Sequence, residues 1–181
     1  MITSQIGRIF LNAYNEKYAK EHDAKTFFSE VFYPLFFNHQ KYMMTAGNSP
    51  LENPKLSWDD MIRGKKPFET EEQRVARYVK LMKKIDDSDA DASIAIGYPS
   101  LDVCATTSGM VSNLQIANSK DDIYLSWIGA GLGVGVQDGF SILFSDRDVL
   151  LEIFSGWKYY REMLNSTSNL KGNQINTWNG Q

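Results

Sequence analysis

Basic side chains gather in one part of this chain, residues 61–84. Eight lysines and arginines lie there against three acids, although the whole chain has a formal net charge of −3. A local excess of this kind attracts the phosphates of nucleic acid or the carboxylates of an acidic protein. The candidate binding residues are Arg63, Lys65, Lys66, Arg77, Lys80, Lys83 and Lys84.

Thr70–Gln73 has the pattern of a helix-starting capping box and predicts a helix from residue 71 to about 85. Four of the candidate cations fall within about 120° of one another on that helix, opposite its apolar side. Such a face is either solvated or a contact for a polyanion. We therefore expect a non-catalytic binding or assembly domain that contacts nucleic acid or an acidic partner through this face. The predicted apolar side consists of Val75, Tyr78, Val79, Met82 and Ile85.

Dispersed carboxylates offer a different chemistry, metal-dependent hydrolysis. Asp59, Asp60 and Asp102 are the candidate acids, and His39 is an additional candidate. Two-metal phosphodiester chemistry requires acidic ligands that converge near a lysine. The chain has no Asp…Glu-x-Lys arrangement in a convincing strand context. We therefore assign no catalytic residue and keep a metal-dependent hydrolase or nuclease as the alternative function.

One acidic turn resembles part of a calcium-binding loop. Asp87, Asp89 and Asp91 match the first three ligand positions of such a loop. Ala92 replaces the required glycine, and Tyr98 stands where the bidentate glutamate belongs. The sequence therefore indicates a solvated turn at the end of the preceding helix, without a calcium site.

The chain contains one cysteine, Cys104, and two histidines, His22 and His39. This set forms no internal disulfide and does not supply a structural zinc site. Cys104 lies in an apolar run, so we expect a small buried side chain rather than a nucleophile. We expect no metal and no cofactor. Residues 1–5 lack the pattern of a secretory signal and no apolar run is long enough to span a membrane, so we expect a cytoplasmic protein without a membrane partner.

Glycine occupies every second position from 129 to 135. Successive side chains of a strand point to opposite faces, so this spacing predicts a strand over about 123–136 with one apolar and one bare face. A bare strand face indicates close approach by the protein's own side chains or by a ligand. The order of the glycines does not match a nucleotide-binding loop.

The dipeptide Asp138–Gly139 is the strongest hairpin signal in the chain. A two-residue turn there would pair Gly135 with Ile142 and Gly133 with Phe144, whose side chains would cover the bare face. Two earlier glycines have no such cover. They are the candidate ligand-binding residues, Gly129 and Gly131.

Helical spacing of apolar residues predicts the elements around this hairpin. Pro34 should kink or break the second of the predicted helices. Because helices come first and are followed by strands and a closing amphipathic helix, we expect an α+β fold. Its small antiparallel sheet should have a glycine-rich central hairpin and cover about residues 103–145. The predicted helices cover residues 3–20, 24–37, 71–85 and 146–164.

A change of composition after residue 164 marks the limit of the predicted domain. Residues 1–164 are expected to form a single α+β domain. Asn, Ser, Thr and Gly dominate residues 165–181, as in a polar surface segment or linker. The sequence shows no closing element before Gln181, which is compatible with a larger assembly or a C-terminal continuation.

Overall fold

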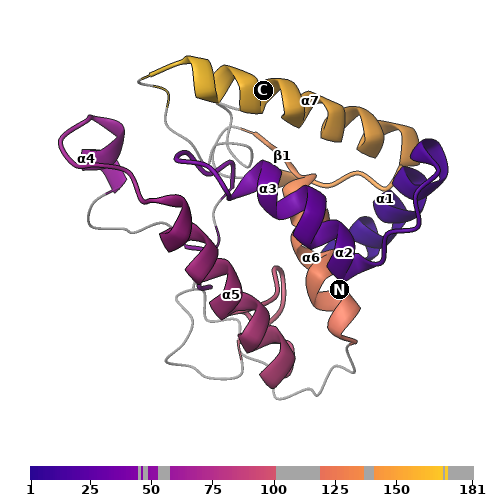
Figure 1. Cartoon of the computed structure of the whole chain (residues 1–181). Helices are drawn as coiled ribbons and strands as arrows, with labels where there is room; N and C mark the ends of the chain where they lie inside the picture. The colour runs from indigo at the N-terminus through magenta and orange to yellow at the C-terminus, as the bar shows by residue number, and fades with distance from the viewer. Residues whose placement is uncertain are drawn as a thin grey trace.

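The computed structural model describes residues 1–44, 46, 49–52, 58–100, 119–136, 141–168 and 170. This part of the chain is mostly helical and contains one small antiparallel sheet of two strands, in agreement with the helix-rich α+β class. In chain order the elements of Figure 1 are α1 (Ile2–Tyr18), α2 (Ala24–Phe27), η1 (Phe28–Phe32), α3 (Tyr33–Phe36), α4 (Trp58–Ile62), α5 (Glu71–Asp87), α6 (Lys120–Gly131), β1 (Val134–Gly135), β2 (Ser141–Ile142) and α7 (Arg147–Ser166).

Residues 120–131 form the helix α6, so the predicted strand over 123–136 is wrong for most of its length. Ser119 begins the helix with a capping box. Its hydroxyl accepts from the Asp122 amide at 3.2 Å, and its own amide donates to the Asp122 carboxylate at 3.1 Å. Residues 123–131 are all buried. A helix buried on every side lacks an amphipathic period, so the alternating glycines are the stronger local pattern in the sequence.

Two glycines make the contact between α1 and α6 close. A methyl group added at Gly129 would overlap the Thr3 carbonyl oxygen and lie 2.8 Å from the Gly7 amide nitrogen. A methyl group added at Gly7 would overlap the Leu125 carbonyl oxygen in the same way. The two helix backbones therefore meet directly, and only residues without a side chain allow this approach.

β1 and β2 pair with Val134 opposite Ile142 and Gly135 opposite Ser141. The predicted register, with Gly135 opposite Ile142, is therefore wrong by one residue. A connection longer than a two-residue turn joins the strands, and a one-residue slip moves each side chain to the other face. Ile142 accordingly is 47% exposed and does not cover a glycine. The predicted turn at Asp138–Gly139 lies outside the described residues.

The second predicted helix is continuous from Ala24 to Phe36 through α2, η1 and α3. The Asp23 side chain caps its first turn. Pro34 does not break this helix, because the wide π turn η1 precedes it. In η1 the Tyr33 amide donates to the Phe28 carbonyl, five residues earlier. The helix then continues although Pro34 has no amide hydrogen to donate.

Aromatic side chains form the centre of the core. The Phe32 and Phe36 rings stack with their centroids 4.2 Å apart. The buried ring of Trp127 of α6 lies 5.8 Å from that of Phe37, and the buried ring of Phe154 of α7 lies 5.1 Å from that of Phe10. α7 packs against α1 and runs along one edge of the molecule in Figure 1. None of the helices in the described ranges is both long and apolar enough to cross a membrane. Residues 171–181 lie outside these ranges, so the polar segment stays a prediction.

Candidate functional site

Three of the predicted basic residues lie on the turn between α4 and α5. Arg63, Lys65 and Lys66 are all exposed there. The Asp60 carbonyl holds this turn by accepting from the Lys65 amide at 2.7 Å and the Lys66 amide at 3.2 Å. The Lys66 ammonium also lies 3.7 Å from the Asp60 carboxylate. We call residues 63–66 the basic turn, and its three cations point to solvent.

α5 is rotated about its axis relative to the sequence prediction. It buries Leu81 and Ile85, whereas Val75 and Val79 are 40% and 56% exposed. The predicted apolar side included both valines and omitted Leu81, so that prediction is wrong at these positions. Packing against the rest of the fold decides which side of α5 is buried. The spacing of the apolar residues alone is compatible with burial of either side.

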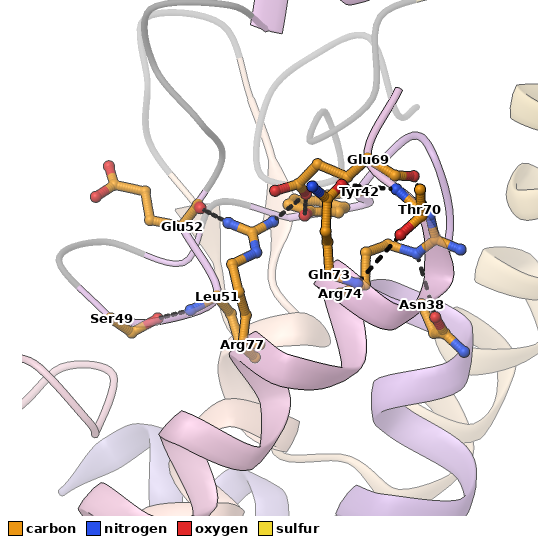
Figure 2. Close-up of polar contacts among 10 residues, drawn as sticks. All are labelled: Asn38, Tyr42, Ser49, Leu51, Glu52, Glu69, Thr70, Gln73, Arg74 and Arg77. Carbon is orange, nitrogen blue, oxygen red and sulfur yellow. Dashed lines mark hydrogen bonds and ion pairs between the residues drawn. The ribbon is translucent and has the colours of Figure 1, made fainter. Parts of the chain in front are cut away.

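The first turn of α5 is fixed by the predicted capping box, which is confirmed. The Thr70 amide donates to the Gln73 side chain at 2.9 Å, and the Gln73 amide donates to the Thr70 hydroxyl at 3.4 Å. Arg74 donates to the Glu69 carbonyl at 2.7 Å and to the Asn38 side-chain oxygen at 3.2 Å. Figure 2 shows how these bonds fasten the start of α5 to the segment after α3.

Arg77 lies in an inward network and not with the outward lysines of α5 (Figure 2). Its guanidinium donates to the Glu69 carboxylate at 2.7 Å and to the Glu52 carbonyl, and it lies 5.2 Å from the centre of the Tyr42 ring. The Tyr42 hydroxyl donates to the same carboxylate at 2.7 Å. Burial lowers the pKa of Arg77 and raises the pKa of Glu69. The structure therefore gives Arg77 a role in holding the fold together.

Replacing Arg77 with methionine should lower the free energy of unfolding by about 1–2 kcal/mol, because the Glu69 carboxylate and the Glu52 carbonyl lose a donor. The Arg77 and Glu69 side chains are 21% and 20% exposed, so water screens part of this loss. Urea unfolding measures the change. Lys80→Met, at an exposed position of the same helix, is the matched control and should alter stability by less than about 0.5 kcal/mol. Equal stability of the two variants would contradict the inward role of Arg77.

The outward side of α5 carries Lys80 and Lys83 next to the two exposed valines. Lys84 lies at the edge of this side, where its ammonium donates to the Ser93 hydroxyl. At 100° per residue the exposed positions of α5, apart from Glu71 and Gln73 in its first turn, cover about 140° of the helix. We call this surface the outer face of α5. It consists of Glu72, Val75, Ala76, Val79, Lys80, Lys83, Asp86 and Asp87.

The predicted ligand-binding glycines, Gly129 and Gly131, both face the protein's own atoms. The α1 backbone fills the space beside Gly129. A methyl group added at Gly131 would lie 2.6 Å from the Phe32 ring and 3.2 Å from the Phe36 ring. In this structure both glycines make room for packing partners inside the core.

The candidate residues for hydrolysis lie on separate elements. Asp59 and Asp60 belong to α4, and His39 follows α3. Asp102 and Cys104 lie outside the described residues. Among the residues that the structure does describe, no three His, Cys, Asp or Glu side chains are placed to hold a metal ion. The hydrolase alternative stays a hypothesis that no observation here favours.

The sequence analysis missed two buried cations, Lys41 and Arg161. Arg161 of α7 is 5% exposed and donates to three carbonyls at and just after the end of α3, at 2.7, 2.9 and 3.4 Å. Lys41 is 9% exposed and donates to the Leu164 carbonyl at 3.0 Å and to the Thr167 carbonyl. Arg161 therefore caps the C-terminal end of α3, and Lys41 caps the C-terminal end of α7. Burial lowers the pKa of Lys41 and lowers that of Arg161 to about 10.

Comparison of the chain with protein-family models, with curated proteins and with solved structures yields no match. Its function is therefore argued from its own surfaces and pockets. Two regions carry chemistry that the fold alone does not require. They are the outer face of α5 with the basic turn, and the surroundings of Lys41 and Arg161.

Proposed function

We propose that this protein is a non-catalytic binding or assembly module that contacts an acidic protein partner through the outer face of α5 and the basic turn. One observation carries the proposal. Val75 and Val79 are exposed on the same side of α5 as Lys80 and Lys83. A cytoplasmic location belongs to the proposal and rests on the cysteine content of the sequence, which is a single residue.

The spacing of these side chains suits packing against a partner helix. Val75 and Val79 are four residues apart and lie one above the other, so they form a short apolar stripe along α5. Lys80 and Lys83 border this stripe on one side. A partner helix with an apolar stripe bordered by carboxylates would match both properties. α5 has 17 residues. It is therefore about 25 Å long, enough for a small interface.

The charges on α5 favour a protein over nucleic acid. Its outer face sets two lysines against three acids, Glu72, Asp86 and Asp87, and Arg77 is turned inward. The three cations of the basic turn lie outside this helix. Duplex DNA carries roughly one charge per 1.7 Å of its axis, so acids at both ends of the face would repel it. A protein partner can place its carboxylates opposite the lysines alone. The valines can also contribute apolar contacts to a protein partner, whereas they make no contacts with phosphates.

Fluorescence anisotropy can test this proposal with defined probes. The first probe is a labelled amphipathic peptide with leucines at helical spacing and glutamates elsewhere. The second has serine in place of each leucine, and the third is a mixed-sequence DNA duplex. We expect the leucine peptide to bind in roughly the micromolar range and at least about tenfold more tightly than the other two. Tighter binding of the duplex, with a steep salt dependence, would contradict the proposal and indicate that the partner is nucleic acid.

Charge reversal locates the binding surface. Lys80→Glu combined with Lys83→Glu should weaken binding of the leucine peptide by about tenfold or more, because each reversal turns an attraction into a repulsion. Val79→Ser should weaken it by about threefold through lost apolar contact. Lys20→Glu, at an exposed lysine outside α5, is the matched control and should have less than about a twofold effect. Equal effects at Lys20 and at the α5 lysines would contradict the proposal.

A further inference from the structure

A pocket of about 260 Å³ opens where the segment after α3 meets the start of α5 and the end of α7. Six of its seven lining residues have polar side chains, and among these described residues none is acidic. The pocket is separate from the outer face of α5, because Arg74, its contribution from α5, lies on the other side of that helix. The lining residues are Asn38, His39, Gln40, Lys41, Arg74, Leu164 and Asn165.

Positive charge dominates this pocket. Lys41 and Arg74 line it, and the buried Arg161 lies behind Lys41, to whose carbonyl it donates at 2.7 Å. The C-terminal ends of α3 and α7 each contribute about half a negative charge, and the Glu71 carboxylate, which accepts from the Asn38 side-chain amide at 3.4 Å, contributes one more. The three cations therefore leave an excess of about one positive charge. Burial lowers the pKa of His39 to about 4, and the charges of Arg161 and Arg74 act in the same direction. The His39 ring therefore experiences a positive environment.

Donors remain for a ligand after the structural hydrogen bonds are made. An ammonium has three N–H donors and a guanidinium has five. Lys41 uses two of its donors on helix carbonyls, and Arg74 bonds to one carbonyl and one side-chain oxygen. The Asn165 side chain adds an exposed amide at the rim. Both cations therefore retain N–H donors that their present partners do not use.

We propose that this pocket binds a small phosphate-class oxyanion, either free or as the phosphomonoester of a small molecule. Lys41 and Arg74 supply the charge, and the Asn165 amide supplies a neutral donor, as does the one N–H of the Asn38 amide that is not used on Glu71. Charge-assisted bonds from a guanidinium suit phosphate oxygens because several N–H groups lie in one plane. A neutral His39 can accept a hydrogen bond from a protonated phosphate oxygen. The volume accommodates the anion together with a short attached group.

Isothermal titration calorimetry at constant ionic strength tests the pocket with inorganic phosphate and, separately, glycerol 3-phosphate. We expect saturable binding of inorganic phosphate with a Kd of about 1 mM or below. A tighter Kd for glycerol 3-phosphate identifies a phosphomonoester as the ligand, and an equal Kd identifies the free anion. Absence of saturable binding of both compounds up to about 50 mM overturns the proposal.

Asn165→Asp places a carboxylate at the rim and should weaken phosphate binding at least about tenfold. The matched control is Ser166→Asp, which adds the same charge to the same helix end at a residue that does not line the pocket. It should alter the Kd by less than about threefold. Asn165 and Ser166 are both exposed, so both variants should fold. Equal weakening by the two substitutions would show a general charge effect and overturn the site.

Discussion

Gly129→Ala is expected to lower the free energy of unfolding by about 3–5 kcal/mol or to prevent folding. The added methyl group would overlap the Thr3 carbonyl oxygen and lie 2.8 Å from the Gly7 amide nitrogen. Both obstacles are backbone atoms of α1, which cannot rotate away as a side chain can. The overlap can be removed only if the two helices separate, and their separation would open the core between them.

Gly156→Ala is the matched control for this experiment. Gly156 lies in α7, and a methyl group added there would meet no atom within 4 Å. Alanine is the better helix former, so this variant should gain up to about 1 kcal/mol. Urea unfolding of both variants gives the comparison. If Gly129→Ala unfolds at the same urea concentration as Gly156→Ala, the close contact between α1 and α6 is wrong.

The protein should lose about 3 kcal/mol of stability through His39 as the pH falls from about 6.5 to 4. Burial, the main cause, lowers the pKa of folded His39 from 6.5 to about 4. The unfolded chain therefore binds a proton at His39 below pH 6.5, whereas the folded protein does so only near pH 4. A group with a lowered folded pKa contributes its full stability above the unfolded pKa. That contribution disappears as the pH approaches the folded pKa.

His39→Gln removes this titration and keeps a side-chain donor for the Pro34 carbonyl, to which the ring is hydrogen-bonded. Urea unfolding at several pH values in phosphate-free buffer measures the difference between the variant and the parent. The parent should lose more stability on acidification, by about 3 kcal/mol. Identical slopes for His39→Gln and the parent would contradict a half-buried His39 with a lowered pKa.

Local signals made much of the helical framework predictable. The structure places α1 at Ile2–Tyr18 where the sequence predicted 3–20, and the helix through α3 ends at Phe36 where the sequence predicted 37. α5 begins at the predicted capping box. Caps and amphipathic spacing act within a few residues, so they can be recognised without knowledge of the fold.

α6 also begins at a capping box, Ser119–Asp122, but the sequence after it favours a strand. Its glycines alternate as in a strand, and the burial of residues 123–131 removes the polar face that marks a helix. The backbone of α1 is what requires a glycine at position 129. Position 7, which is the other half of that contact, lies 122 residues away in the sequence. A contact between residues so far apart in the sequence produces no pattern in the neighbouring residues of either one.

The candidate sites depend on the same long-range information. Periodicity placed Arg77 with the outward lysines, but its partners Glu52 and Tyr42 belong to another segment and draw it inward. Lys41 and Arg161 cap helix ends more than 100 residues away. The sequence marks Arg161 only as a cation within the apolar stripe of α7. Helix ends that need a donor become visible only when the helices are placed in space.

Methyl NMR of the protein with the leucine–glutamate peptide tests the central claim most directly, because it reports which valines the peptide touches. Val75 and Val79 are exposed on α5, Val149 is 37% exposed on α7, and Leu150 is fully buried. The account predicts that peptide addition shifts the methyl signals of Val75 and Val79 in a saturable manner and leaves those of Val149 and Leu150 in place. Unchanged Val75 and Val79 signals at saturating peptide, or larger shifts at Val149, would contradict the assignment of α5 as the binding surface.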